Sequence, residues 1–406
     1  MRLLFIADGR SPITLNWIRH FSETGQEVHL LSTFPCKVEI PLESLSYVSV
    51  AFSGQSTSIK SSPTHRAMGD AKGIGLRIAI RHWFGPFTIL SAARQVRSRI
   101  EAIKPDLIHA MRIPFEGMLA AAIDHPVPLL LSVWGNDFTL HAPASPWMRN
   151  LTRRALLRAD ALHVDCRRDQ RLAKEWGFDP ERPVKVLPGA GGIRRDLFYT
   201  VNFAAKPLVP VLPYGVGEIP EDVLVVVNPR GFRAYIRNDT FFKAIPRILS
   251  EHPETLFLCP AMKDERRAER WLNRFDIHHA VRLLPKLEQH EMASVFRRAH
   301  IAVSLSEHDG TPNTLLEAMA CGSFPVAGDL ESIREWIEDG ANGLLVNPGE
   351  PDEVANAVLR AGTNREVLEH AQAKNDRIVE ERASYHRVMR EAEEFYAALL
   401  GEVPSL

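Results

Sequence analysis

The sequence predicts an α/β protein with two doubly wound, Rossmann-like domains, and three observations support this prediction. Short apolar runs alternate with helical patterns along most of the chain. A proline- and glycine-rich stretch at 206–222 interrupts the alternation, which then starts again. The chain has 406 residues, too many for one ordinary hydrophobic core. Strands that alternate with helices form parallel sheets covered on both faces.

The first half of the chain contains the apolar runs expected of one such sheet. The run 3–7 ends at a turn at 8–12, and a helix is expected at 13–24. The further predicted strands are 27–31, 107–109, 128–133, 161–164 and 184–187.

The second half repeats the pattern. A strand at 223–227 is followed by a predicted helix at 238–251. The further predicted strands are 255–259, 281–284, 301–305, 324–327 and 343–346. A long amphipathic helical stretch at 365–400 closes the chain. The predicted organisation is a domain at 1–200, a linker at 201–222, a domain at 223–385 and a helix at 386–406 that packs back on the first domain. Ligands of such sheets bind at the carboxyl ends of the strands, so we expect a site in a cleft between the domains.

Composition excludes several classes of protein. Hydrophobic residues make up 45% and charged residues 24%, as in soluble globular proteins, and a formal net charge of -1 gives no reason to expect nucleic-acid binding. No run of 18 apolar residues predicts a membrane span, and the first apolar run is too short for a signal peptide. Four scattered cysteines predict neither a disulfide framework nor a zinc site. We therefore expect a cytoplasmic protein.

The segment 304–322 is the most informative part of the sequence. A buried strand ends near Leu305, a polar loop with Gly310 and Pro312 follows, and a helix begins near Asn313 or Thr314. The first amides of a helix lack intrahelical acceptors and the helix dipole favours negative charge there. This arrangement is typical of a site for the phosphates of a nucleotide diphosphate.

Two carboxylates accompany this loop. Asp309 lies within it and Glu317 lies one turn into the helix, and carboxylates accept hydrogen bonds from the hydroxyls of sugars and riboses. An alternative is purely structural: Thr314 and Glu317 have the spacing of a capping box, and Asp309 with Gly310 forms an ordinary turn.

The spacing and context of these residues resemble the signature of the family-four, or group 1, retaining glycosyltransferases of the GT-B fold. That signature has an acidic residue, seven further residues and a Glu in a Leu-Glu-Ala-Met-Ala context, as Asp309 and Glu317 have here, followed by a glycine and a strand. The first acid is Asp where the family usually has Glu. The resemblance extends over nearly the whole chain, through the segments 8–12, 105–109, 132–137, 186–198 and 342–349.

The resemblance implies transfer of a hexose-type sugar from a nucleotide-diphosphate donor to a hydroxyl acceptor, which is a glycan, a lipid-linked sugar or a small molecule. It implies that Glu317 holds the donor ribose and that Asp309 faces the hydroxyls of the donor sugar. The residues of the loop and helix start would meet the phosphates or the sugar: Gly310, Thr311, Pro312, Asn313, Thr314 and Leu315.

Phosphates also need cations, and three arginines follow the strand at 223–227. The family has an Arg and a later Lys; Arg230 matches the Arg, and Arg233 or Arg237 replaces the missing Lys. A guanidinium binds phosphate through two parallel hydrogen bonds. The alternative is a solvated basic loop. No Asp-x-Asp metal motif occurs, so we expect a metal-independent reaction that retains configuration and needs no cofactor.

Residues on the acceptor side are expected in the first domain. The resemblance includes Ser11, in the first loop, and Asp137, which follows a strand. Asp137 is equally compatible with an N-cap, and His109 is interpreted as a core histidine.

A basic stretch with aromatic residues lies at 60–104. Trp83, Phe84 and Phe87 are interleaved with basic residues, which only Asp70 and Glu101 oppose. The basic residues are Lys60, Arg66, Lys72, Arg77, Arg81, Arg94, Arg97, Arg99 and Lys104. Such a stretch suits peripheral contact with an anionic membrane at its inner face, or a phosphorylated or lipid-linked acceptor. The alternative is a solvated helix face with core aromatics.

Other functions are compatible with this fold. A glycoside phosphorylase would depend on phosphate without a nucleotide, and a non-catalytic nucleotide-sugar-binding protein would show no turnover. A dinucleotide-dependent oxidoreductase is disfavoured, because Gly-x-Gly-x-x-Gly is missing after the first strand.

Overall fold

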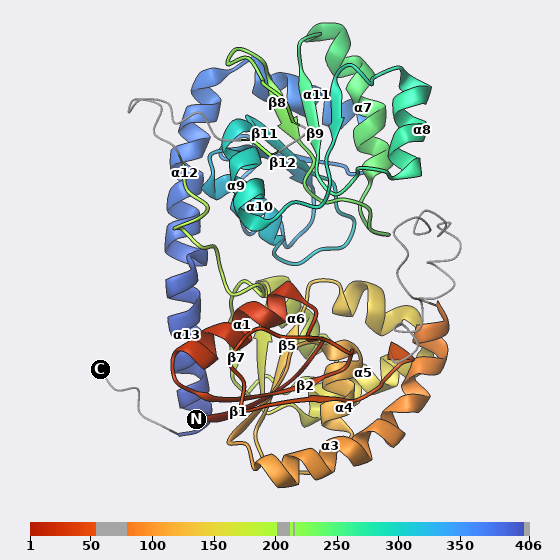
Figure 1. Ribbon diagram of the computed structural model, residues 1–406, viewed down its shortest axis with the longest axis vertical. Coiled ribbons are helices and arrows are strands. Elements are labelled where there is room, and N and C mark those ends of the chain that lie inside the picture. The colour runs from red at the N-terminus through yellow and green to blue at the C-terminus, as the bar shows by residue number, and fades with distance from the viewer. Residues whose placement is uncertain (54–78, 201–211, 214–215, 402–406) are drawn as a thin grey trace. The chain divides into compact units, whose positions relative to one another are not determined.

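The computed structural model of the chain describes residues 1–53, 79–200, 212–213 and 216–401. The chain forms two compact units (Figure 1): the first consists of Met1–Gly192 with Val388–Leu406, and the second of Ile193–Arg387. The sequence placed the end of the first domain at residue 200. Most of the expected linker at 201–222, namely 201–211 and 214–215, lies outside the described residues.

The first unit contains a seven-stranded, all-parallel sheet of order β3-β2-β1-β4-β5-β6-β7. Its strands are β1 Arg2–Ala7, β2 Glu27–Ser32, β3 Ser44–Tyr47, β4 Leu107–Ala110, β5 Leu129–Val133, β6 Ala161–Val164 and β7 Val184–Val186. Central strands of such a sheet are buried on both faces and therefore read as continuous apolar runs. The edge strand β3 escaped sequence prediction because its four residues, Ser-Leu-Ser-Tyr, are half-buried or exposed.

Helices cover this sheet (Figure 1). They are α1 Pro12–Glu23, α3 Ile89–Ile103, α4 Met118–Ala121, α5 Pro146–Arg158, α6 Arg167–Glu175 and the part of α13 (Tyr385–Leu399) from Val388 onward. Short helical turns lie at η2 Gly85–Thr88, η3 Ile113–Gly117, η4 Asp137–His141 and η5 Ala142–Ala144. Helix α1 starts with a proline, whose missing amide costs nothing at this position, and it buries Thr14, Trp17, Ile18 and Phe21 at helical spacing.

A buried polar chain ties α13 to this sheet. His109 of β4 hydrogen-bonds the Ser132 hydroxyl at 2.7 Å and the Tyr396 hydroxyl at 2.5 Å. Tyr396 also stacks on Phe21 of α1 with ring centroids 4.5 Å apart. Burial lowers the pKa of His109 well below its ordinary value, so the ring is neutral. The interpretation of His109 as a satisfied core histidine is confirmed.

The second unit contains a six-stranded parallel sheet of order β10-β9-β8-β11-β12-β13. Its strands are β8 Val225–Val227, β9 Leu256–Cys259, β10 Val281–Leu283, β11 Ile301–Ser304, β12 Phe324–Gly328 and β13 Leu344–Val346. Its helices are α7 Asn238–Glu251, α8 Arg266–Phe275, α9 Gln289–Arg298, α10 Asn313–Ala320, α11 Pro351–Gly362 and α12 Arg365–Ala383. Both units therefore have the doubly wound architecture that the sequence predicts.

The closing helical stretch differs from its prediction, because the chain forms two helices, α12 and α13, rather than one. The break lies at Ser384, whose backbone is extended at φ −64° and ψ 140°. The extended backbone lets the chain pair with Ile193, whose amide donates to the Ala383 carbonyl at 2.7 Å and whose carbonyl accepts from the Tyr385 amide at 2.9 Å. Periodicity does not reveal this break, since the bonds that cause it are long-range.

No helix among the described residues is long and apolar enough to cross a bilayer. The four cysteines are free thiols, three of them buried and Cys36 half-buried.

Candidate active site

The candidate site lies where the strand order of the second sheet reverses. Strands β8 and β11 are neighbours there, and the chain leaves them in opposite directions to build the two halves of the sheet. A crevice opens outside the carboxyl ends of the strands at such a point. Arg230 follows β8, and the loop 305–312 follows β11 and leads into α10. The fold therefore brings together two segments that are about 80 residues apart in the sequence.

The Arg230 side chain is hydrogen-bonded to the loop after β11 and to the start of α10. Its Nη2 donates to Asp309 Oδ2 at 2.7 Å, and its Nη1 donates to Thr314 Oγ1 at 3.3 Å. The Ser306 hydroxyl donates to the same Asp309 oxygen at 2.8 Å. The side chains of Arg230 and Asp309 are only 10% and 15% exposed. The ion pair is thus partly desolvated and fixed in orientation, which an exposed basic loop would not be.

Glu317 is buried beneath the start of α10. Its Oε1 accepts a hydrogen bond from Asn313 Nδ2 at 2.6 Å, within one turn of the helix. Burial raises the pKa of Glu317 to about 7, although the positive charge of Arg230 opposes this increase. A carboxyl that gains and loses its proton near neutral pH is typical of functional sites.

The capping-box alternative is wrong. Helix α10 begins at Asn313 after Pro312 at the N-cap, and no side chain caps its first amides. Thr314 therefore lies inside the first turn, where its hydroxyl accepts from Arg230. An ordinary turn does not account for all the contacts of Asp309. Its carboxylate forms the ion pair described above, and its carbonyl accepts from the Ser332 hydroxyl at 2.8 Å.

Two polar atoms at this site are buried and lack a hydrogen-bond partner: Nε of Arg230 and Oδ1 of Asn313. The amides of Asn313 and Thr314, the first two of α10, also lack intrahelical acceptors, whereas the Leu315 amide donates to the Pro312 carbonyl at 3.0 Å. Buried polar groups in folded proteins are normally paired, so unpaired ones at a strand-end crevice indicate a place for a ligand. Thr311 is fixed beside them, because its hydroxyl accepts from Trp336 Nε1 at 3.1 Å.

The remaining residues predicted here divide into two groups. Gly310, Pro312 and Leu315 are buried and form the backbone of the loop and helix start. Arg237 donates to Asp239 at 2.9 Å and to Glu307 at 2.9 Å.

Arg233 differs from the other two arginines. It is exposed on the surface. The alternative of a solvated basic loop therefore describes Arg233, whereas Arg230 is half-buried and paired with Asp309, and Arg237 is paired with Asp239 and Glu307.

The first unit contains a cavity of about 280 Å³ at its own strand ends, lined by residues that follow β1, β4 and β5. Ser11, predicted for the acceptor side, and Trp134 are among its lining residues. Asp137 does not line it. Its buried carboxylate instead accepts from Arg112 Nε at 2.9 Å and from the amides of Ile113 and Trp134 at 3.2 and 3.1 Å.

Asp137 therefore positions Arg112 and does not itself line the cavity. The N-cap alternative does not describe it either, because the amides that it accepts from precede it in the chain. Sequence reasoning missed Arg81, Arg112 and Glu116 as lining residues of the cavity. Arg112 follows a predicted strand, and this position could have identified it from the sequence. Nothing in the local sequence around Arg81 distinguishes it from an arginine on the surface.

Two family models match the chain. The model described as "Glycosyl transferase 4-like domain" matches residues 9–189, and the model described as "Glycosyl transferases group 1" matches residues 225–364.

Curated relatives agree with these models. A D-inositol 3-phosphate glycosyltransferase of Geodermatophilus obscurus is 26% identical over 210 residues, which are 49% of this chain and 44% of the relative. An enzyme of Catenulispora acidiphila with the same activity in its name is 33% identical over 197 residues, 46% of this chain and 44% of the relative. The chain thus spans less than half the length of these relatives.

Solved structures match over the full chain. Sucrose-phosphate synthase from Thermosynechococcus elongatus superposes with a TM-score of 0.72 at 14% identity, covering 99% of this chain and 100% of that one. Anabaena HepE in complex with UDP-glucose superposes with a TM-score of 0.68 at 13% identity, covering 98% and 100%. At these identities the likeness concerns the fold.

Proposed function

Because the chain belongs to the group 1 glycosyltransferases of the GT-B fold, we propose that it moves a hexose-type sugar from a nucleotide-diphosphate donor to a hydroxyl acceptor. The observation that carries this proposal is the group formed by the half-buried ion pair of Arg230 and Asp309 and the buried Glu317, at the strand-order reversal of the second sheet. Its unpaired polar atoms indicate that a polar ligand completes it.

The diphosphate of the donor would lie between Arg230 and the start of α10. The guanidinium has an unpaired Nε for an anionic oxygen, and the first helix amides supply further donors. The same groups would stabilise the negative charge that develops on the leaving diphosphate. Anabaena HepE is described with UDP and with UDP-glucose, which supports uridine nucleotides as the first donors to test.

Glu317 would accept hydrogen bonds from the donor ribose. An ionised carboxylate accepts from two hydroxyls, and ribose presents two adjacent ones. Because burial raises the pKa of Glu317 to about 7, binding of a hydroxyl pair would draw the carboxyl toward its ionised form. We therefore expect donor binding to release protons near neutral pH.

Asp309 would face the hydroxyls of the donor sugar, with Arg230 and Ser306 holding its carboxylate in place. The acceptor hydroxyl would attack the anomeric carbon from the face that the diphosphate leaves. The new C–O bond forms as the bond to the diphosphate breaks, and a donor phosphate oxygen takes the hydroxyl proton. This course retains configuration, and the arginine and helix amides take the charge-neutralising role of a metal.

A thermal-shift screen of nucleotide diphosphates and their sugars tests the donor site. Since a ligand raises the melting temperature by mass action, one nucleotide should stabilise the wild type and lose its effect on Glu317→Ala. Glu254→Ala, at an exposed loop position, is the control and should keep the shift. No shift with any nucleotide in the wild type would refute the donor assignment.

Turnover is measured separately with the nucleotide that binds. Release of nucleoside diphosphate in EDTA, and an NMR assignment of the product anomer, test metal independence and retention. Binding without turnover on any acceptor would contradict the transferase proposal, and turnover that requires phosphate instead of nucleotide would indicate a phosphorylase.

The proposal includes peripheral contact with an anionic membrane through the first unit. Phe84 and Phe87 are each 58% exposed and Leu90 is 71% exposed, and Phe87 packs edge-on against the half-exposed Trp147. Trp83 is also exposed, so the alternative of core aromatics is wrong. Exposed aromatic rings beside basic side chains are typical of surfaces that rest in a lipid headgroup layer.

The basic residues of this stretch do not share one surface. Arg94, Arg97, Arg99 and Lys104 are exposed on or just after α3, whereas Arg81 is part of the cavity of the first unit. Lys60, Arg66, Lys72 and Arg77, together with Asp70, lie outside the described residues. Flotation with phosphatidylglycerol and with phosphatidylcholine vesicles at low salt tests the contact, and absence of binding to the anionic vesicles would refute it. The cytoplasmic location stays a prediction.

A further inference from the structure

The cavity of the first unit lies at the position that matches the candidate donor site in the second. The order of the first sheet reverses between β1 and β4, and the cavity is lined by Asp8 and Arg10 after β1, by Arg112 after β4 and by Trp134 after β5. This is the crevice at which doubly wound sheets bind ligands. Arg81, in the helical residues 79–84 before η2, closes another side.

Three polar atoms that line this cavity are buried and have no hydrogen-bond partner: Thr14 Oγ1, Arg81 Nε and Trp134 Nε1. Guanidinium and indole N–H groups only donate, and a hydroxyl also donates. The unmet demand of the cavity is therefore for acceptors, which the described residues do not supply. A ligand that fits here brings acceptor oxygens.

The charge around the cavity favours anionic acceptors. Arg81 forms no ion pair with a carboxylate in the part of the chain that the structure describes, and it stacks over the Phe34 and Phe115 rings at 5.2 and 4.5 Å. Burial lowers the pKa of Arg81, with the Glu116 carboxyl opposing. A positive charge that is fixed by aromatic rings and lacks a close counter-ion is suited to bind an anion.

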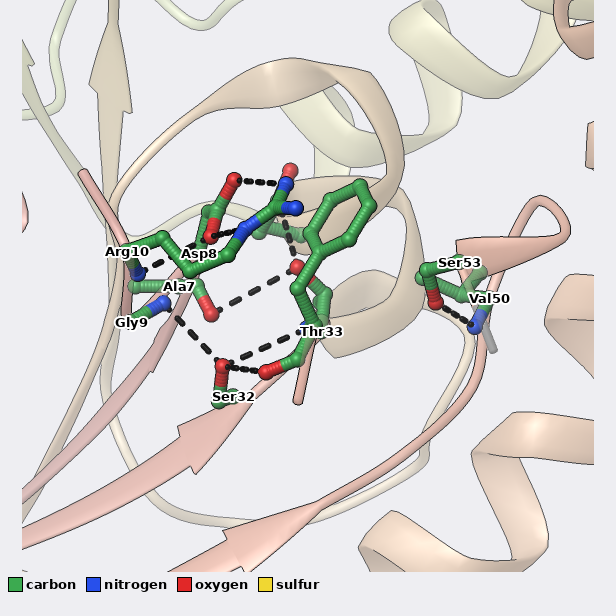
Figure 2. A network of polar contacts seen from close by, with 10 residues as sticks. Ala7, Asp8, Gly9, Arg10, Ser32, Thr33, Val50 and Ser53 are labelled. Carbon is green, nitrogen blue, oxygen red and sulfur yellow. Dashed lines mark hydrogen bonds and ion pairs between the residues drawn. The ribbon is translucent and has the colours of Figure 1, made fainter. Parts of the chain in front are cut away.

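The two other arginines of the cavity are held in position by their own carboxylates. Arg112 donates from Nε to Asp137 and from Nη2 to Asn136 at 2.8 Å, which leaves its guanidinium edge fixed. Figure 2 shows Arg10 turned back on Asp8, with contacts of 3.0 and 2.9 Å. These pairs orient the arginines in advance, so an anion would meet a preorganised group.

The other titratable groups that line the cavity are Glu116, His82 and His141, beside the Asp8 carboxylate that pairs with Arg10. Burial raises the pKa of Glu116, whose Oε1 accepts from the Thr33 hydroxyl at 2.6 Å. His82 and His141 hydrogen-bond each other at 2.9 Å, and burial lowers the pKa of His141 to about 2. The histidines are therefore neutral at physiological pH, and the arginines determine which ligands are attracted.

The backbone of the cavity wall is strained where it faces this space. Phe115, a lining residue, has φ 69° and ψ −51°, a conformation that non-glycine residues rarely adopt. Such strain costs on the order of 1–3 kcal/mol and is retained mainly at functional sites. It positions the Phe115 ring beneath Arg81.

We propose that this cavity binds an anionic group of the acceptor, a phosphate monoester or a carboxylate, through Arg81, Arg112 and the indole N–H of Trp134. The acceptor would then be an anionic hydroxyl compound whose charged group is anchored in this cavity. This inference rests on the proposed transferase function, because it names the acceptor class of the same reaction. The anion site itself is measurable without turnover.

Calorimetric titration of the full chain at constant ionic strength tests the site. The probes are inorganic phosphate, glycerol 3-phosphate against glycerol, and glucuronate against glucose, so that phosphate and carboxylate are distinguished from each other and from uncharged analogues. Arg81→Gln should weaken binding of the preferred anion by roughly tenfold or more, since it removes a charged donor. Arg94→Gln, at an exposed position on α3, is the matched control and should bind as the wild type does.

Two further variants keep the result interpretable. Trp134→Phe removes the unpaired indole N–H while keeping an aromatic ring. It should also weaken anion binding, even if Arg81→Gln does not fold. Arg230→Gln leaves the first unit intact, so anion binding that persists in it cannot belong to the donor site. Wild-type affinity in both Arg81→Gln and Trp134→Phe, or no anion binding in the wild type, would overturn the inference. A nucleotide shift on the same samples reports on the donor site independently.

Discussion

The buried carboxyl of Glu317 makes the stability of the second unit depend on pH. Below pH 4.5 this carboxyl is protonated in both the folded and the unfolded chain. Between pH 4.5 and about 7 the unfolded chain loses the proton while the folded chain keeps it, so the folded state is progressively destabilised. The interval from 4.5 to about 7, at about 1.36 kcal/mol per pH unit, gives a loss of about 3 kcal/mol by pH 8.

Glu317→Gln removes this titration with little change of shape. The side-chain amide of Gln retains an oxygen that accepts from Asn313 Nδ2, as Glu317 Oε1 does at 2.6 Å. The variant should therefore equal the wild type near pH 4.5 and exceed it by about 3 kcal/mol at pH 8. Urea unfolding of both proteins at pH 5 and pH 8, extrapolated linearly to water, measures the difference.

The control for this measurement is Glu254→Gln, which removes the same charge from an exposed loop of the same unit. Its difference from the wild type should be small at both pH values, because exposed groups contribute little. A Glu317→Gln difference that is equal at pH 5 and pH 8 would refute the reasoning. In that case the carboxyl is solvated or ionised in the folded protein, and burial does not control its protonation.

Three further predictions concern contacts inside each of the two units. Arg230→Met should destabilise the second unit by about 3 kcal/mol, because Asp309 keeps a buried charge, and an Arg230→Met, Asp309→Leu double variant should regain most of this loss in urea unfolding. Gly328→Ala should cost about 1–3 kcal/mol and weaken nucleotide affinity, since a Cβ there would lie 2.7 Å from the Ser306 carbonyl; unchanged calorimetric affinity would contradict this. Tyr396→Phe should lower the unfolding free energy by about 1–3 kcal/mol, because it leaves the buried Nδ1 of His109 without a partner, and hydrogen exchange in α13 should increase.

Much of the fold was determined by the sequence alone. Buried parallel strands are continuous apolar runs, which can be recognised without tertiary information. All twelve strands predicted from such runs recur in the structure, and among the described residues only the edge strand Ser44–Tyr47 was missed. The site loop was equally predictable. A strand end, Gly310, Pro312 and a helix start at Asn313 follow one another in the chain, as local sequence patterns predict.

Only the tertiary structure decided which polar residues meet. Arg230 and Arg233 lie three residues apart on one loop, yet one is half-buried against Asp309 and the other is exposed. Arg81 belongs to a basic stretch that suggests a surface, yet it lines a cavity with Arg112 and Trp134. The break at Ser384 depends on pairing with Ile193, almost two hundred residues away. Local hydrophobic periodicity determines the elements, whereas the pairing and desolvation of charges depend on neighbours that only the folded chain brings within hydrogen-bonding distance.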